Sequence, residues 1–75
     1  MSNVTFLKDK APTLEEAQAI VEGYVEMHTM DEGRQMLMNE EALPRRMELN
    51  LEASALMGWP VHGPVAVLEG KAKWK

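Results

Sequence analysis

Residues 24–40 read YVEMHTMDEGRQMLMNE, and this stretch decides the fold of the chain. Two strand-like runs, 24–30 and 34–40, flank an Asp-Glu-Gly tripeptide. A type I turn followed by a glycine in the left-handed conformation is a common connection between two antiparallel strands. The stretch therefore predicts a β-hairpin in which Met30 faces Arg34.

The predicted hairpin has two faces, because successive side chains of a strand point to opposite sides of the sheet. One face pairs residues 25, 27 and 29 with residues 39, 37 and 35, and the other pairs residues 24, 26 and 28 with residues 40, 38 and 36. Both faces are partly apolar, so we expect one to pack on helices and the other to be an interface or a ligand face. Four residues define this second face, called the hairpin face below: Tyr24, His28, Met36 and Met38.

Two short helices are predicted from their capping residues. Thr13 and Glu16 have the spacing of a capping box, in which each side chain bonds the other residue's backbone amide, so a helix is expected over residues 14–22. Asn50 is a favourable N-cap for a second helix over residues 51–57. A glycine follows each of these segments and is expected to end the helix.

Residues 61–68 are predicted to form a third strand, because they are rich in β-branched residues. The expected fold class is therefore α+β. It has a small antiparallel sheet, made of the hairpin and this C-terminal strand, with the two short helices on one face. Within the second helix, Leu56 is the expected buried anchor.

A single domain is expected at residues 13–70, since a chain of 75 residues has room for only one hydrophobic core. Residues 1–12 are predicted to be an N-terminal arm, either loose or added to the sheet as an edge strand. Residues 71–75 form a basic tail, in which Trp74 is expected to be exposed unless it docks on the body.

Three segments of the sequence resemble a known protein family. They are DEGR at residues 31–34, MNEE at residues 38–41 and NLEASALMGWPVHGPV at residues 50–65. This succession is similar to the domain-of-unknown-function family 3846, small proteins of phages and bacteria, over about residues 23–68. The resemblance implies a hairpin, a capped helix and a following strand, in a phage or bacterial setting. It implies no biochemical activity.

The charges of the chain are unevenly distributed. The net charge is −4, but residues 11–70 hold eleven acidic residues against three arginines, a net charge of −8. Such a body repels phosphate backbones, so direct binding to nucleic acid is not expected. An acidic mimic of nucleic acid stays open as an alternative function.

Composition excludes further classes of function. The chain has no cysteine, which excludes disulfides, thiolate metal sites and cysteine nucleophiles. No stretch approaches the roughly 20 apolar residues that span a bilayer, and the first ten residues lack the apolar run of a signal peptide. We therefore expect a cytoplasmic protein without a membrane partner.

Few side chains in the sequence could carry chemistry. His28 and His62 lie on different predicted strands and could meet with Glu26 or Glu40 as ligands of a divalent metal ion, although two surface histidines are the plainer interpretation. Ser54 could act as a nucleophile, but a serine between alanines in a helix is more typical of close packing. We therefore predict no enzyme activity, no cofactor and no metal.

The sequence favours a small intracellular, non-enzymatic interaction module of phage or bacterial type. A domain this small has a marginal core, and oligomerisation is one of the usual remedies, so we expect a homo-oligomer, most simply a dimer formed through the hairpin face. A host protein is a further candidate partner. The alternative is a small-ligand binding or sequestering protein, with a pocket lined by Tyr24, His28, Arg34 and Trp59.

Overall fold

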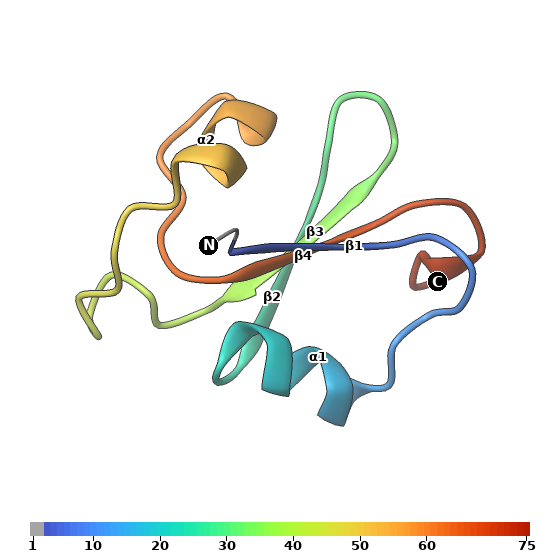
Figure 1. Cartoon of the computed structure of the whole chain (residues 1–75), viewed down its shortest axis with the longest axis horizontal. Helices are drawn as coiled ribbons and strands as arrows, with labels where there is room; N and C mark the ends of the chain where they lie inside the picture. The colour runs from blue at the N-terminus through green and yellow to red at the C-terminus, as the bar shows by residue number, and fades with distance from the viewer. Residues whose placement is uncertain (1–2) are drawn as a thin grey trace.

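The computed structural model describes residues 3–75 and contains one sheet between two helices (Figure 1). The strands lie in the order β1-β4-β3-β2. The elements are, in chain order, β1 (Val4–Leu7), α1 (Leu14–Val21), β2 (Val25–Thr29), β3 (Gln35–Asn39), α2 (Leu51–Met57), β4 (Val65–Leu68) and the short 3₁₀ helix η1 (Gly70–Ala72). The predicted α+β class is confirmed.

The hairpin β2–β3 has the predicted register. Its strands pair antiparallel from Val25 with Asn39 to Thr29 with Gln35. At the loop, the Met30 amide donates to the Arg34 carbonyl at 2.7 Å and the Gly33 amide donates to the Met30 carbonyl at 2.9 Å. Gly33 has a φ of +97°, which explains why the turn needs a glycine there.

The sheet is mixed rather than antiparallel, which corrects the sequence-based expectation. The N-terminal arm contributes β1 as an edge strand, and β1 pairs parallel with β4. The third predicted strand is also shorter than expected, because it begins at Val65 and not at residue 61. Gly63 has a φ of +83°, so the chain turns there before it enters the sheet. Residues 1–2 of the predicted arm lie outside the described residues.

The two helices cover opposite faces of the sheet, so the prediction that both lie on one face is wrong (Figure 1). Every residue of β3 and β4 is buried, and the alternation of the strands sends their apolar side chains to both sides. The α1 side has a core of Ala17, Val21, Leu37, Ala66, Leu68 and Ala72. The α2 side has a core of Val4, Met30, Met36, Met38, Ala53, Val61, Val65 and Val67.

This second core corrects the prediction for the hairpin face. Met36 is 0% exposed and Met38 is 6% exposed, because α2 and the chain after it cover them. Tyr24 stays 64% exposed and His28 stays partly exposed, so the four residues do not form one continuous outer surface. The apolar side chains that were expected to meet a partner meet the protein's own second helix.

The N-caps of both helices are as predicted, but the C-terminal end of the first helix and the interior of the second differ. The Thr13 amide donates to a Glu16 carboxylate oxygen at 2.8 Å, and the Glu16 amide donates to the Thr13 hydroxyl at 3.1 Å. Hydrogen bonds from the backbone and the side chain of Thr13 to the Glu16 carboxylate lower the pKa of Glu16. The helix ends at Val21 and not at residue 22, which adopts the left-handed conformation. In α2 the fully buried residue is Ala53, whereas Leu56 is only partly buried, because the small side chain faces the sheet.

The basic tail is docked on the body. The indole N–H of Trp74 donates to the Pro12 carbonyl at 2.9 Å, and the Trp74 amide donates to the Gln35 side-chain oxygen at 2.6 Å. The Gln35 side-chain amide donates back to the Trp74 carbonyl at 2.7 Å. The tail therefore closes the α1 side of the core, where Trp74 packs against it.

Candidate interaction site

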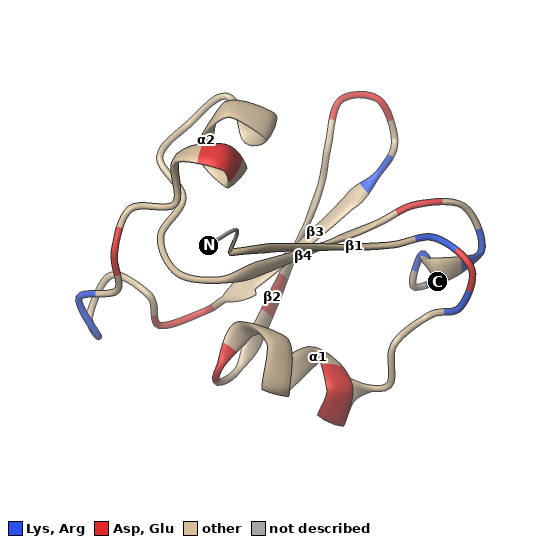
Figure 2. Ribbon diagram, viewed as in Figure 1, with Lys and Arg blue, Asp and Glu red and all other residues tan. Residues whose placement is uncertain are grey.

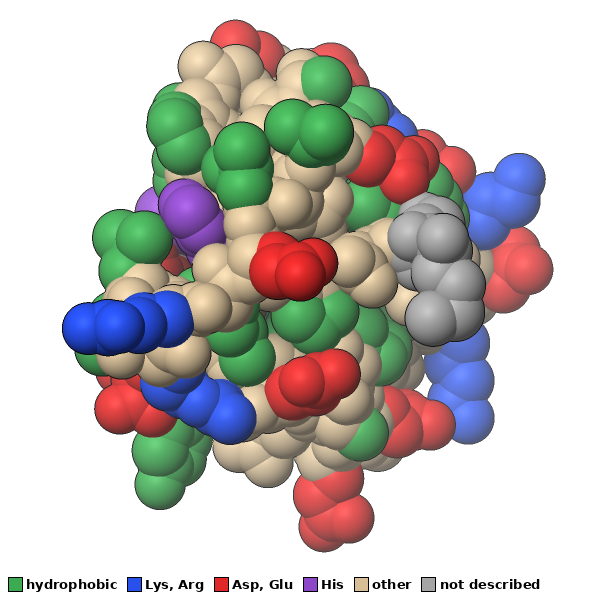
Figure 3. All heavy atoms as spheres, turned by 60° about the vertical axis from the view of Figure 1, so that its left-hand side comes forward, with side chains coloured by type: hydrophobic (Ala, Val, Ile, Leu, Met, Phe, Trp, Pro, Cys, Tyr) green, Lys and Arg blue, Asp and Glu red, His purple; other side chains and the backbone are tan. Residues whose placement is uncertain are grey.

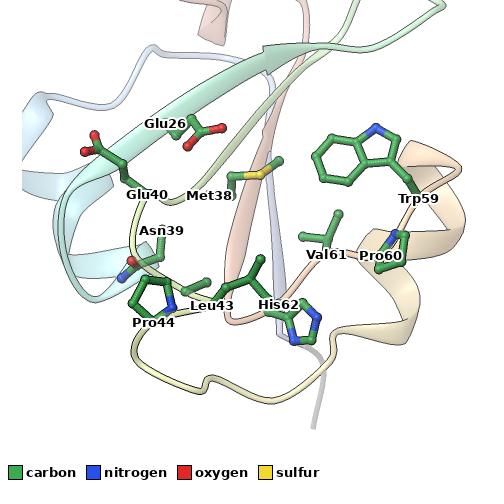
Figure 4. Close-up of a pocket in the computed structure, with 11 residues that line it drawn as sticks. Glu26, Met38, Asn39, Glu40, Leu43, Pro44, Trp59, Pro60, Val61 and His62 are labelled. Atoms are coloured by element: carbon green, nitrogen blue, oxygen red, sulfur yellow. The ribbon is translucent and has the colours of Figure 1, made fainter.

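A hollow of about 190 Å³ opens on the side of the molecule that carries α2 (Figure 4). It lies between the end of the hairpin and residues 58–62, which follow α2 and are called the corner below. Met38 of β3 lies at its base, with Trp59 on one side and Glu40 on the other (Figure 4). Val61 and Pro60 add apolar surface from the corner.

The corner is held by a short network of hydrogen bonds. The Ser54 hydroxyl accepts from the Val61 amide at 2.8 Å and donates to the Val61 carbonyl at 3.3 Å. The Asn50 amide also donates to that carbonyl, at 2.7 Å. Gly58 has a φ of +84° and ends α2, which lets the chain turn directly into Trp59. The small residues of this segment thus place an indole at the rim of the hollow.

The opposite wall is built by the turns that follow β3. Buried Asn39 anchors them, because its side-chain oxygen accepts from the Glu41 amide at 2.7 Å and its side-chain amide donates to the Val21 carbonyl at 3.0 Å. Leu43 and Pro44 then line the hollow. Leu43 is 70% exposed, so an apolar side chain reaches solvent at this wall.

Trp59 is the most informative residue of the hollow. It is 43% exposed, which is a large apolar surface for a tryptophan to leave in water. Its ring makes a T-shaped contact with the His28 ring, with 5.3 Å between the ring centroids and 69° between the ring planes. The His28 imidazole in turn pairs with the Glu26 carboxylate. Figure 3 shows hydrophobic side chains gathered on the face of the molecule that includes α2.

The electrostatic character of the hollow is acidic. Glu26 and Glu40 both line it, and no lysine or arginine does among the described residues. The remaining titratable side chain is His62, whose Nδ1 lies 3.1 Å from the Met47 carbonyl oxygen. An apolar base beneath two carboxylates suits a ligand that is itself apolar along its length and positive at one end.

The structure separates most residues of the predicted pocket. Trp59 lines the hollow and His28 contacts the ring of Trp59, but Tyr24 belongs to a different depression beside Gly23. Arg34 lies by the hairpin loop, where its Nε donates to Glu32 at 2.7 Å and lowers the pKa of that carboxyl. The sequence alone did not point to the wall formed after β3, because that segment has no regular periodicity.

The side chains considered for chemistry are engaged in the fold. His28 and His62 make separate contacts, and within residues 3–75 no three histidine, aspartate or glutamate side chains are placed to hold a metal ion. The Ser54 hydroxyl is used in the corner. None of the described helices has the length and apolar character needed to cross a membrane.

Comparison with known proteins adds nothing to this geometry, since no family model, no curated protein and no solved structure matches the chain.

Proposed function

We propose that this chain is a small, non-enzymatic interaction module that binds a basic segment of a partner protein in the hollow beside Trp59. The observation that carries the proposal is a 43% exposed tryptophan that lines the same hollow as two carboxylates, while no lysine or arginine of residues 3–75 lines it. A host protein is a candidate partner of this kind. Self-association is part of the same proposal.

Both the aliphatic stem and the charged end of an arginine or lysine side chain of the partner fit this hollow. The aliphatic stem can lie against Met38 and Val61, while the cation stays near the rim. Tryptophan is the strongest cation–π acceptor among side chains, with a contribution of about 0.5–2 kcal/mol. The carboxylates of Glu26 and Glu40 add electrostatic attraction for the same cation. Tryptophan and arginine are also the residue types that dominate protein–protein binding energy.

The alternative functions have less support. Pockets for small organic ligands usually have volumes of about 300–1,000 Å³, and this hollow has about 190 Å³. A nucleic-acid mimic needs its carboxylates in a band on one surface. Figure 2 shows them spread over the hairpin loop, both helices and the segment between β3 and α2. A side-chain socket for a protein partner is the better fit.

Fluorescence of Trp59 tests the proposal directly. The chain has two tryptophans, so Trp74→Phe leaves Trp59 as the single reporter. We expect a short capped oligo-arginine peptide to cause a saturable change in Trp59 emission, which weakens as the salt concentration rises. Glu40→Gln should weaken this binding about two- to fivefold, because one partly screened charge interaction is lost.

The matched control is the same peptide with citrulline in place of arginine, which keeps the shape and removes the charge. We expect the citrulline peptide to bind at least about tenfold more weakly. Equal responses to the two peptides, or no saturation with arginine, would contradict the proposal.

A further inference from the structure

The outer edge of β2 is an unpaired strand edge. β2 is the last strand of the sheet, and β3 is its only neighbour in the sheet of residues 3–75. The Glu40 amide bonds the Tyr24 carbonyl, and the Met30 amide bonds the Arg34 carbonyl. Because hydrogen-bonded and non-bonded pairs alternate in an antiparallel ladder, the even-numbered residues of β2 point their backbone groups at β3. The backbone groups of Val25, Met27 and Thr29 therefore point outward.

Side chains beside this edge are not hidden. Met27 is 43% exposed, and Thr29 is also exposed. Glu26 and His28 lie on the other face of the same strand and are partly exposed. Their charges are opposite when the histidine is protonated, and they stand two residues apart.

The β2 edges of two copies complement each other when they pair with Met27 at the centre. If a second copy of the chain adds its β2 antiparallel, with Met27 opposite Met27, then Val25 lies opposite Thr29 and all outward backbone groups meet in hydrogen-bonded pairs. In the same register Glu26 of each copy lies opposite His28 of the other. Such non-bonded pairs bring side chains closest together.

Other registers with the same hydrogen bonding are worse. Sliding the second copy by two residues places either Glu26 opposite Glu26 or His28 opposite His28. Two glutamates, or two protonated histidines, directly opposite each other destabilise a sheet. The charge pattern thus selects one register out of those that the backbone permits.

We propose that the protein forms a two-fold dimer in which the β2 edges of two copies join their sheets, centred on Met27. The inference deepens the self-association within the proposed function and rests on it. In this dimer the contact lies at the edge of the sheet, whereas the sequence-based prediction placed it on the hairpin face. A pairing of five-residue strands buries little surface, so the dimer should be weak and concentration-dependent.

Proline substitution tests the edge. Met27→Pro removes an outward amide, and proline is tolerated in edge strands whose amide faces solvent. Phe6→Pro is the matched control in β1, the other edge strand, where the amides bonded to β4 alternate with outward ones. Sedimentation equilibrium should show a dimer for the natural chain and for Phe6→Pro. Met27→Pro should raise the dissociation constant at least about tenfold, because two symmetric hydrogen bonds are lost.

Charge exchange tests the register and does not depend on proline. At a pH at which histidine is protonated, Glu26→Lys alone and His28→Glu alone each put like charges opposite each other in the homodimer, so each should dissociate. A mixture of the two variants puts opposite charges together at both positions, so the mixture should form a heterodimer. Circular dichroism establishes that each variant is folded.

The outcomes separate the two proposals. A monomer up to millimolar concentration overturns the dimer and the self-association together. A dimer that persists in Met27→Pro, or that only Phe6→Pro dissociates, overturns the β2 edge but leaves self-association standing. Two charge variants that fail to associate on mixing overturn the register. The binding of oligo-arginine by Trp59 is measured separately, on the natural chain and on Met27→Pro, because Glu26 lines the hollow and His28 contacts Trp59.

Discussion

At the scale of single residues, Ser54 shows how one small side chain can position a site. Its hydroxyl both accepts from and donates to the backbone of Val61, which is 2% exposed. Removing the hydroxyl leaves a buried amide without a partner, which costs about 1–3 kcal/mol. We therefore expect Ser54→Ala to lower the free energy of unfolding by that amount, as measured by urea denaturation.

The matched control for this prediction is Ala55→Ser on the exposed side of the same helix, which should change stability by less than about 0.5 kcal/mol. Ser54→Ala should also loosen Trp59, which follows directly in the corner, and shift its emission to longer wavelength. Equal stability of the two variants would mean that the hydroxyl does not hold the corner.

At the scale of elements, the hairpin depends on the backbone of Gly33. A Cβ at this position would meet no atom within 4 Å, so crowding is not the issue. A substitution is costly because of the φ of +97°, which a β-branched residue adopts only with strain. We expect Gly33→Val to destabilise the protein by about 1–2 kcal/mol, seen as a lower midpoint of thermal unfolding. Gly33→Asn should be milder, and an unchanged midpoint for Gly33→Val would contradict this account of the turn.

The second helix shows how an element can be predicted with the right ends and the wrong environment. The Asn50 cap and the Gly58 stop depend on neighbouring residues and are as expected. The burial of Leu56 depends on which way the helix faces the sheet, and Ala53 takes the closest position. Small residues permit close approach, so the large residue beside them lies at the margin of the contact.

At the scale of the whole molecule, the C-terminal tail is tied to the body. Trp74 contacts the core on the α1 side and bonds Pro12 and Gln35, which are distant in sequence. We expect Trp74→Ala to cost about 2 kcal/mol in unfolding free energy, since a partly buried tryptophan is worth less than a fully buried one. Lys75→Ala, next to it and exposed, should cost nothing measurable. Equal denaturation curves for the two variants would show that the tail is not docked.

The chain's local chemistry by itself determined the hairpin register, both N-caps and the glycine at the turn. Each of these rests on hydrogen bonds between residues a few positions apart, or on the φ that one residue can adopt. Such interactions are complete within the segment. They need no knowledge of what packs on it.

Only the tertiary structure decided what covers each face of the sheet. The two apolar faces of the hairpin were visible in the sequence, but hydrophobic burial is non-directional. A face that must be covered does not specify whether a helix of the same chain or a second molecule covers it. Here α2 covers Met36 and Met38, and β1 extends the sheet. The hollow forms between the end of β3, the turns after it and the residues that follow α2.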